Sequence, residues 1–232
     1  MDVFEDFLNL ILPSNCVLCA ASGSNLCVQC ERSLNLGVRK VSRLGLHGFA
    51  TTTYTEQVSK LIHEFKESKQ TSLANNFSRA MLPALQSYNS QVFELQDCVL
   101  VNMPSKKQSF SKRGFTPAKL LAQKLARQVA KSQNILLHTY SGLGYVPQLA
   151  NQISDQAALS GSDRRTNLIG TMRAQGIPRF NRAILIDDIV TTGSTLAEAS
   201  RALAEIGVEV LGFVAFAETL PKNLQKRHAK LV

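Results

Sequence analysis

The stretch that most constrains this chain is AILIDDIVTTGST, at residues 183–195. It opens with four apolar residues, 183–186, and this unbroken run predicts a strand covered on both faces, as in a parallel sheet. Two adjacent carboxylates, Asp187 and Asp188, follow where we expect that strand to leave the sheet. A turn of small residues and a helical pattern come next, and Gly207 stands where a helix-ending glycine belongs. The stretch therefore predicts one strand–turn–helix unit of an α/β fold, with a parallel sheet flanked by helices.

The turn and the start of that helix together predict an anion-binding site. The first N–H groups of a helix have no partner inside it, and the helix dipole adds partial positive charge there. A glycine lets the backbone approach a phosphate closely, and hydroxyl side chains add donors. The two carboxylates suit hydroxyl groups or a metal ion on the same ligand. A sugar phosphate fits both halves of the site, although an N-capped helix without a ligand is the alternative. The candidate residues are Asp187, Asp188, Val190, Thr191, Thr192, Gly193, Ser194 and Thr195.

Four of the five cysteines form two CxxC pairs, Cys16–Cys19 and Cys27–Cys30. Two such pairs supply the four thiolates of a closed, structural zinc site, which would hold structure and would not activate water. An iron–sulfur cluster or two disulfides are the alternatives, and we favour zinc. We therefore expect residues 1–44 to form an N-terminal helix and a four-Cys zinc module, and residues 45–232 to form the main α/β domain. Cys98 lies in an apolar run and is predicted to be a buried strand residue.

Length and hydropathy exclude a membrane-spanning protein. The 232 residues can hold one α/β domain and a small appendage. No apolar run approaches the roughly 18 residues that a membrane span needs. The N-terminus carries Asp2, Glu5 and Asp6, which is the wrong sign for a secretory signal. These features predict a cytoplasmic protein.

The net charge of +9 is concentrated in one segment. Residues 98–154 carry eight of the 26 Lys and Arg residues and no carboxylate, whereas the rest of the chain has 18 cations and 17 acids. A solvated helix face accounts for residues 119–131, but a basic loop after a predicted strand suits pyrophosphate or a DNA backbone. Phe110 and Phe115 in that loop fit either a platform for unpaired bases or side chains tucked onto the core. The candidate residues are Lys106, Lys107, Lys112, Arg113 and Gly114.

Apolar patterns place the remaining elements along the chain. Period-two or continuous apolar runs predict strands, helical stripes predict helices, and stretches rich in Gly, Gln, Asn and Ser predict loops. We expect an N-terminal helix at 4–12, strands at 47–54, 99–103, 135–139 and 208–217, helices at 58–65, at 73–85 and from Pro117 onward, loops at 104–115 and 141–161, and a polar tail after 217.

Residues 187–195 resemble the loop of type I phosphoribosyltransferases that binds phosphoribosyl pyrophosphate (PRPP). The pattern of those enzymes is an apolar strand, Asp/Glu-Asp, and then Val-x-Thr-Thr-Gly-x-Thr. The resemblance implies that Asp187 and Asp188 contact the 2′- and 3′-hydroxyls of the ribose. It also implies that residues 191–195 hold the 5′-phosphate and that Mg²⁺ accompanies PRPP.

The order of four motifs resembles the ComF family of phosphoribosyltransferase-like proteins, which is associated with DNA uptake in natural transformation. The motifs are the CxxC pairs, the Lys-Arg-Gly-Phe loop, a Gln-x-x-Leu-Ser-x-x-x-Arg-x-x-Asn stretch and the Asp-Asp-x-Val-Thr-Thr-Gly loop. The resemblance implies that Cys16, Cys19, Cys27 and Cys30 are zinc ligands and adds Gln156, Arg164 and Asn167 as loop candidates. It also implies that single-stranded DNA and proteins of the uptake machinery are partners.

Three functions fit this sequence. The chain could be a PRPP-binding competence protein that handles incoming single-stranded DNA. It could be an active phosphoribosyltransferase of nucleotide salvage that releases pyrophosphate, or a non-catalytic adaptor of the uptake complex. No residue set points to a particular acceptor base, and the arginines usual in the family shortly before the Gln-x-x-Leu-Ser stretch are absent here. Whether the protein catalyses transfer is left open.

Overall fold

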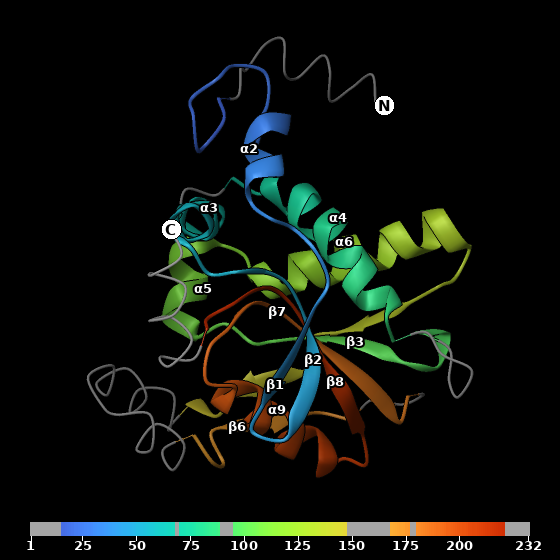
Figure 1. The fold of residues 1–232 in the computed structure, drawn as a ribbon. Coiled ribbons are helices and arrows are strands. Elements are labelled where there is room, and N and C mark those ends of the chain that lie inside the picture. Colours follow the sequence, from blue (N-terminus) through green and yellow to red (C-terminus); the bar gives the residue numbers. More distant parts are fainter. Residues whose placement is uncertain (1–14, 68–69, 89–94, 148–167, 177–179, 221–232) are drawn as a thin grey trace.

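A mixed β-sheet forms the centre of the protein (Figure 1). The computed structural model describes residues 15–67, 70–88, 95–147, 168–176 and 180–220. In these residues the sheet has the order β1-β2-β8-β7-β3-β4. Strand β1 pairs antiparallel with β2, and all other neighbours in the sheet are parallel. This confirms the predicted α/β class. The strands are β1 (Arg39–Arg43), β2 (Leu46–Thr53), β3 (Val99–Asn102), β4 (His138–Tyr140), β7 (Arg182–Val190) and β8 (Glu209–Glu218).

Two layers cover the sheet, one on each face (Figure 1). Alternate residues of β7 serve the two layers: Ile184 and Ile186 pack with the first, and Ala183 and Leu185 with the second. This double covering explains why the strand is apolar without a break. The first layer contains α3 (Glu56–Glu67), α4 (Leu73–Gln86) and α6 (Pro117–Gln133), and the second contains α9 (Ser194–Ala204) with the antiparallel pair β5 (Leu143–Tyr145) and β6 (Met172–Ala174).

Aromatic rings fill the first layer. Phe77 of α4 stacks on Phe216 of β8 with ring centroids 3.9 Å apart, and Phe65 of α3 meets Phe77 edge-on at 5.2 Å. Phe115 packs against Phe65 at 5.8 Å, so it belongs to this core. Phe110, in contrast, is 48% exposed. Of the two proposed base-stacking residues, Phe110 is exposed and Phe115 is half-buried against the core.

The basic segment after β3 is helical, although we expected a loop over residues 104–115. Helix α5 (Lys107–Arg113) ends at Gly114, which has a φ of +77° and donates its N–H to the carbonyl of Phe110. The stretch KQSFSKR contains no helix breaker, and a glycine just after it is a normal C-terminal cap. A basic composition is thus as compatible with a short capped helix as with a loop.

Two further differences arise from strand pairing. Strand β7 continues through Val190, because Asp187 and Ile189 pair with Ala215 and Ala217 of β8. The two carboxylates therefore lie within the strand and not after it. Strand β5 falls in the expected loop 141–161 and exists because it pairs with β6. The other predicted strands and helices in the described residues are present, with β4 beginning at His138.

The cysteine-containing segment packs on the first layer. Its helix α2 (Val28–Ser33) lies near α4, and Glu31 pairs with Arg79 at 3.3 Å. Leu26 and Leu34 are buried in the same apolar cluster as Phe65. The division of the chain at residue 44 stays a prediction, and β1, which precedes that position, is hydrogen-bonded into the main sheet. A short 3₁₀ helix, η1 (Leu95–Asp97), precedes β3. Cys98 is buried as predicted, but it lies one residue before β3 and not within the strand.

The aromatic stack predicts a large penalty for truncating Phe77, whose side chain is fully buried. Phe77→Ala removes two ring contacts and leaves a cavity, so we expect the free energy of unfolding to fall by about 3–5 kcal/mol. Urea denaturation followed by circular dichroism measures this. Leu136→Ala, at a side chain that is 70% exposed, is the control and is expected to change stability by less than about 0.5 kcal/mol. Equal effects of the two substitutions would contradict this description of the core.

Candidate functional site

The turn between β7 and α9 has the conformation that an anion site requires. Gly193 has a φ of +82° and stands at the N-terminal cap of α9. The hydroxyls of Thr192 and Ser194 lie 2.9 Å apart, while Thr191 and Thr192 are exposed. The first N–H groups of an eleven-residue helix therefore lie beside exposed hydroxyls, which is the donor set that a phosphate prefers.

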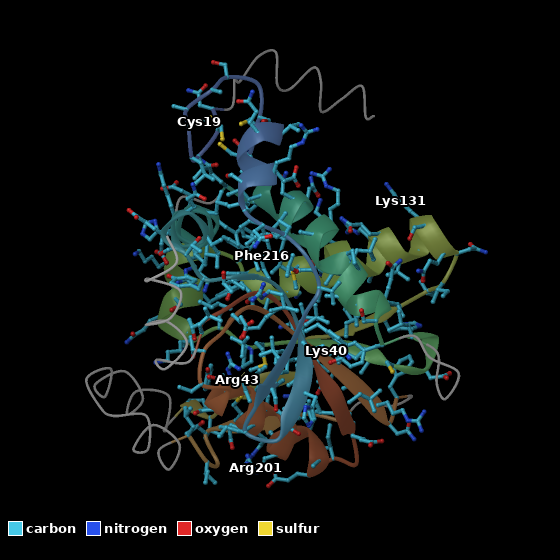
Figure 2. All side chains as sticks on the ribbon, viewed as in Figure 1. Cys19, Lys40, Arg43, Lys131, Arg201 and Phe216 are labelled. Carbon is cyan, nitrogen blue, oxygen red and sulfur yellow. The ribbon has the colours of Figure 1, made fainter. Side chains whose placement is uncertain are left out.

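Arg43 of β1 holds this turn from the side (Figure 2). Its Nε donates to the carbonyl of Thr191 at 2.8 Å, and its Nη2 donates to the carbonyl of Thr219 at 2.8 Å. The same Nη2 pairs with the buried carboxylate of Glu218 at 3.0 Å. A Cβ on Gly193 would lie 2.4 Å from the Cβ of Arg43, so glycine is required there by contact as well as by φ. The arginine fixes the backbone of the turn and adds positive charge beside it.

The two carboxylates of β7 lie next to each other at the carboxyl end of the strand, with Asp188 buried and Asp187 half-buried. The Asp188 side chain is 5% exposed, and its Oδ2 lies 2.6 Å from Nζ of Lys66 on α3. The Asp188 N–H donates to Oδ1 of Asp187 at 2.9 Å. Burial and the neighbouring Asp188 raise the pKa of Asp187 well above its usual value. The pKa of Tyr145 is raised to about 12, mainly by burial and to a smaller extent by the charge of Asp187.

A cleft of about 230 Å³ opens beside this pair. The loop after β3, helix α5 and strand β5 supply its other walls. It thus joins two acids, three cations and a phenol from segments far apart in the chain. The residues 191–195 do not line it. The charged and phenolic residues that line it are Asp187, Asp188, Lys66, Lys106, Arg113 and Tyr145.

The predicted basic residues divide into two groups around the cleft. Lys106 and Arg113 line it. Arg113 donates from Nε and Nη2 to Glu67, at 3.0 and 2.6 Å, and Lys112 pairs with the same carboxylate at 2.8 Å. These two cations, Lys112 and then Arg113, lower the pKa of Glu67 to about 2. Glu67 therefore fixes the basic helix against the end of α3.

The other cations of the segment lie farther out. Lys107 is exposed on α5, and Gly114 serves as the C-terminal cap of that helix. Lys119, Lys124, Arg127 and Lys131 follow along α6, and Figure 2 shows Lys131 near the end of α6 that is remote from α5. The basic segment therefore extends from the cleft along a helix surface.

The four cysteines of the two CxxC pairs converge at one end of the molecule (Figure 2). Their Sγ atoms all lie within 4.8 Å of one another, and Cys19 and Cys27 are 3.7 Å apart. A tetrahedral metal with bonds of about 2.3 Å to sulfur requires sulfur–sulfur separations of about 3.8 Å. All four are free thiols rather than disulfides. The set can hold a metal ion.

The electrostatics of the cluster also favour a bound cation. Burial opposes ionisation of Cys16, but hydrogen bonds from the backbone of Cys27, Cys19 and Leu18 outweigh burial and lower its pKa to about 6. Burial and the neighbouring thiols raise the pKa of Cys30 to about 12. Ionisation of one cysteine thus opposes ionisation of the next, and a bound metal ion would allow all four to ionise by balancing their charge.

Sequence reasoning missed Lys66, Tyr145 and Arg43. Each reaches the site from a separate element, α3, β5 or β1, and none lies in a local motif. The loop candidates Gln156, Arg164 and Asn167 lie outside the described residues. So do the expected N-terminal helix at 4–12 and the polar tail from residue 221 onward.

Comparison with known proteins identifies the class. The phosphoribosyl transferase domain family matches residues 110–231, just over half of the chain. The chain therefore belongs to the phosphoribosyltransferase domain family.

Individual relatives indicate which group of phosphoribosyltransferase-like proteins the chain resembles. Competence protein F of Haemophilus influenzae is 30% identical over 165 residues, which is 67% of this chain and 66% of that protein. DNA utilization protein YhgH of Escherichia coli K12 is 29% identical over 168 residues, or 72% of this chain and 70% of the relative. The YhgH protein of Salmonella typhimurium LT2 is 25% identical over 239 residues, covering 91% of this chain and all of the relative. Within its class, the chain belongs to the ComF family.

In the described part of the chain, no helix combines the length and apolarity that crossing a membrane demands.

The thiol cluster predicts about one metal ion per purified chain, measured by elemental analysis. Cys19→Ser removes one ligand from an exposed position, so we expect metal content to fall by at least half and the melting temperature to drop. Cys98→Ala is the matched control, because Cys98 is a free thiol outside the cluster, and its metal content is expected to equal that of the wild type. Unchanged metal content in Cys19→Ser would rule out the four-thiol site.

Proposed function

We propose that the protein binds PRPP, with its ribose diol on the acid pair and its 5′-phosphate on the turn before α9. The observation that carries this proposal is the cleft that Asp187 and Asp188 line together with Lys106 and Arg113. Asp187 and Asp188 accept the 2′- and 3′-hydroxyls. The residues Val190, Thr191, Thr192, Gly193, Ser194 and Thr195 surround the phosphate, with N–H groups and hydroxyls as donors.

The pyrophosphate of PRPP fits the cationic side of the cleft. Lys106 and Arg113 line that side, and an arginine fork matches phosphate oxygens. Mg²⁺ bound with PRPP would neutralise part of the pyrophosphate charge and stabilise it as a leaving group. The protein contributes position and charge, which are the main requirements of such a transfer.

Turnover is the second candidate function, as an active phosphoribosyltransferase that releases pyrophosphate. The intact Asp187–Asp188 pair and its cleft favour this function. A panel of nucleobases tested for pyrophosphate release separates the enzyme from a binding protein. Release with any one base identifies the acceptor, and no release with any of them supports a binding role.

The PRPP site predicts a sharp loss of affinity when the acid pair is removed. We expect Asp187→Ala/Asp188→Ala to weaken PRPP binding by at least about tenfold, because two charge-assisted hydrogen-bond acceptors are lost. Titration calorimetry with Mg²⁺ measures the dissociation constants. Glu209→Ala, at an exposed carboxylate at the start of β8, is the control and is expected to bind as the wild type does. Equal affinity in the double variant would eliminate the site.

The metal of the cysteine cluster is, in this proposal, structural zinc. Four thiolates within 4.8 Å of one another supply a complete tetrahedral ligand set, which suits zinc in a closed site. The ion would hold a segment with little apolar core of its own onto the first helix layer.

We further propose that the protein handles single-stranded DNA in the cytoplasm during DNA uptake, together with proteins of the uptake machinery. The support is the name of the Haemophilus relative, Competence protein F, and the carboxylate-free basic segment. Lys107, Lys112 and the cations of α6 provide backbone contacts outside the cleft, and exposed Phe110 provides a ring for stacking. A non-catalytic adaptor role in the same machinery is the remaining alternative.

Electrostatic binding of DNA predicts a steep dependence on salt. The logarithm of the binding constant is expected to fall linearly with the logarithm of salt, with a slope of about −0.7 for each phosphate neutralised. Fluorescence anisotropy with a labelled oligothymidine measures it. Neutralising exposed Lys119, Arg127 and Lys131 to Gln is expected to make the slope shallower, whereas Lys60→Gln on α3 is the control. Affinity that does not change with salt would contradict this role.

A further inference from the structure

Lys66 lies in the N-terminal half of the chain, outside the residues 110–231 that match the phosphoribosyl transferase family. It nevertheless lines the cleft, where its Nζ is 2.6 Å from Oδ2 of Asp188. Its side chain is 24% exposed, so the ammonium can be reached from the cleft. The site is thus completed by a cation from a helix that precedes the matched domain.

Helix α3 is anchored so that this cation stays at the cleft. Lys66 occupies the last turn of α3, and the next residue, Glu67, pairs with Lys112 and Arg113 of α5. Val58, Leu61, Ile62 and Phe65 of the same helix are buried in the first layer. Lys66 is therefore held between the acids of β7 and the cations of α5 by packing and by ion pairs.

The contact with Asp188 has a consequence for any ligand that uses that carboxylate. A ribose hydroxyl that donates to Oδ2 of Asp188 must share that oxygen with an ammonium 2.6 Å away, and sharing weakens both interactions. A ligand diol therefore competes with Lys66. When the Lys66 ammonium leaves Asp188, it remains in the cleft. Lys106 and Arg113 line the same cleft, and the three cations together can bind an anion there.

We propose that Lys66 is an exchangeable cation of the site: it neutralises Asp188 when the cleft is empty and moves to the pyrophosphate when PRPP binds. This inference rests on the proposed PRPP site and adds a specificity to it. Without a pyrophosphate, a sugar phosphate must displace Lys66 and gives it no new partner. The residue therefore makes the site prefer ligands that carry a pyrophosphate over ribose 5-phosphate.

The test compares the dissociation constants of PRPP and ribose 5-phosphate, both with Mg²⁺, by titration calorimetry. In Lys66→Met, PRPP binding is expected to weaken by at least about tenfold, because a charge-assisted contact is lost. Binding of ribose 5-phosphate is expected to stay equal or to tighten, because its competitor is gone. Lys66→Arg keeps the charge and is expected to retain the wild-type preference within about threefold. Lys60→Met, at an exposed lysine on the same helix, is the matched control and is expected to leave both constants unchanged.

The outcomes separate the two proposals. If wild type binds both ligands and Lys66→Met weakens both equally, Lys66 only supports the acid pair and the inference is overturned. If Lys66→Met is destabilised in a thermal melt, Lys66→Arg decides, since loss of the preference with the charge retained also overturns it. If wild type binds neither ligand, the proposed function itself fails. The inference is supported if Lys66→Met loses the preference for PRPP over ribose 5-phosphate while Lys66→Arg and Lys60→Met keep it.

Discussion

The rest of the site depends on two adjacent carboxylates of the central strand, of which Asp188 is buried and Asp187 is half-buried. Strand β7 is covered on both faces, so Asp187 and Asp188 at its end cannot both be fully solvated. A buried unpaired charge costs several kcal/mol, and two like charges side by side add repulsion. Lys66 forms an ion pair with Asp188 and compensates its charge. The pKa of Asp187 is raised, so this carboxyl group holds its proton more readily than an exposed one.

Helix α3 links the two carboxylates of β7 to the cations of α5 through a series of ion pairs. Lys66 faces the acids, and Glu67 faces the cations of α5, so neighbouring residues of one helix compensate charges of opposite sign. Toward the β1 edge of the sheet, Glu218 of β8 is buried and is compensated by Arg43 and Arg39 of β1. Arg43 also holds the turn before α9 through Thr191. The N-terminal half of the chain thus supplies the counter-ions for a site whose motifs lie in the C-terminal half.

The sequence is informative where the determinants are local. The strand–turn–helix unit at 183–204 follows from its apolar run, its glycine and its helical stripe, and the cysteine cluster follows from spacing alone. Lys66, Arg43 and Tyr145 could not be found in this way, because an isolated Lys, Arg or Tyr on a helix or strand has no distinguishing neighbour pattern. The extension of β7 to Val190 likewise depends on pairing with β8, which begins 19 residues after β7 ends. Composition was a poor guide at α5, where a basic stretch proved helical.

The cysteine segment is coupled to the same site through the first helix layer. Cys16, Leu26 and Leu34 share an apolar cluster with Phe65, which lies next to Lys66 on α3. The hydroxyl of Thr52 donates to the carbonyl of Leu34 at 2.9 Å, and this bond ties the end of the segment to β2. A metal ion that orders this segment therefore also closes the core over α3. Because α3 carries Lys66 into the cleft, the cysteine cluster and the acid pair depend on one packed layer, even though they lie in different parts of the molecule.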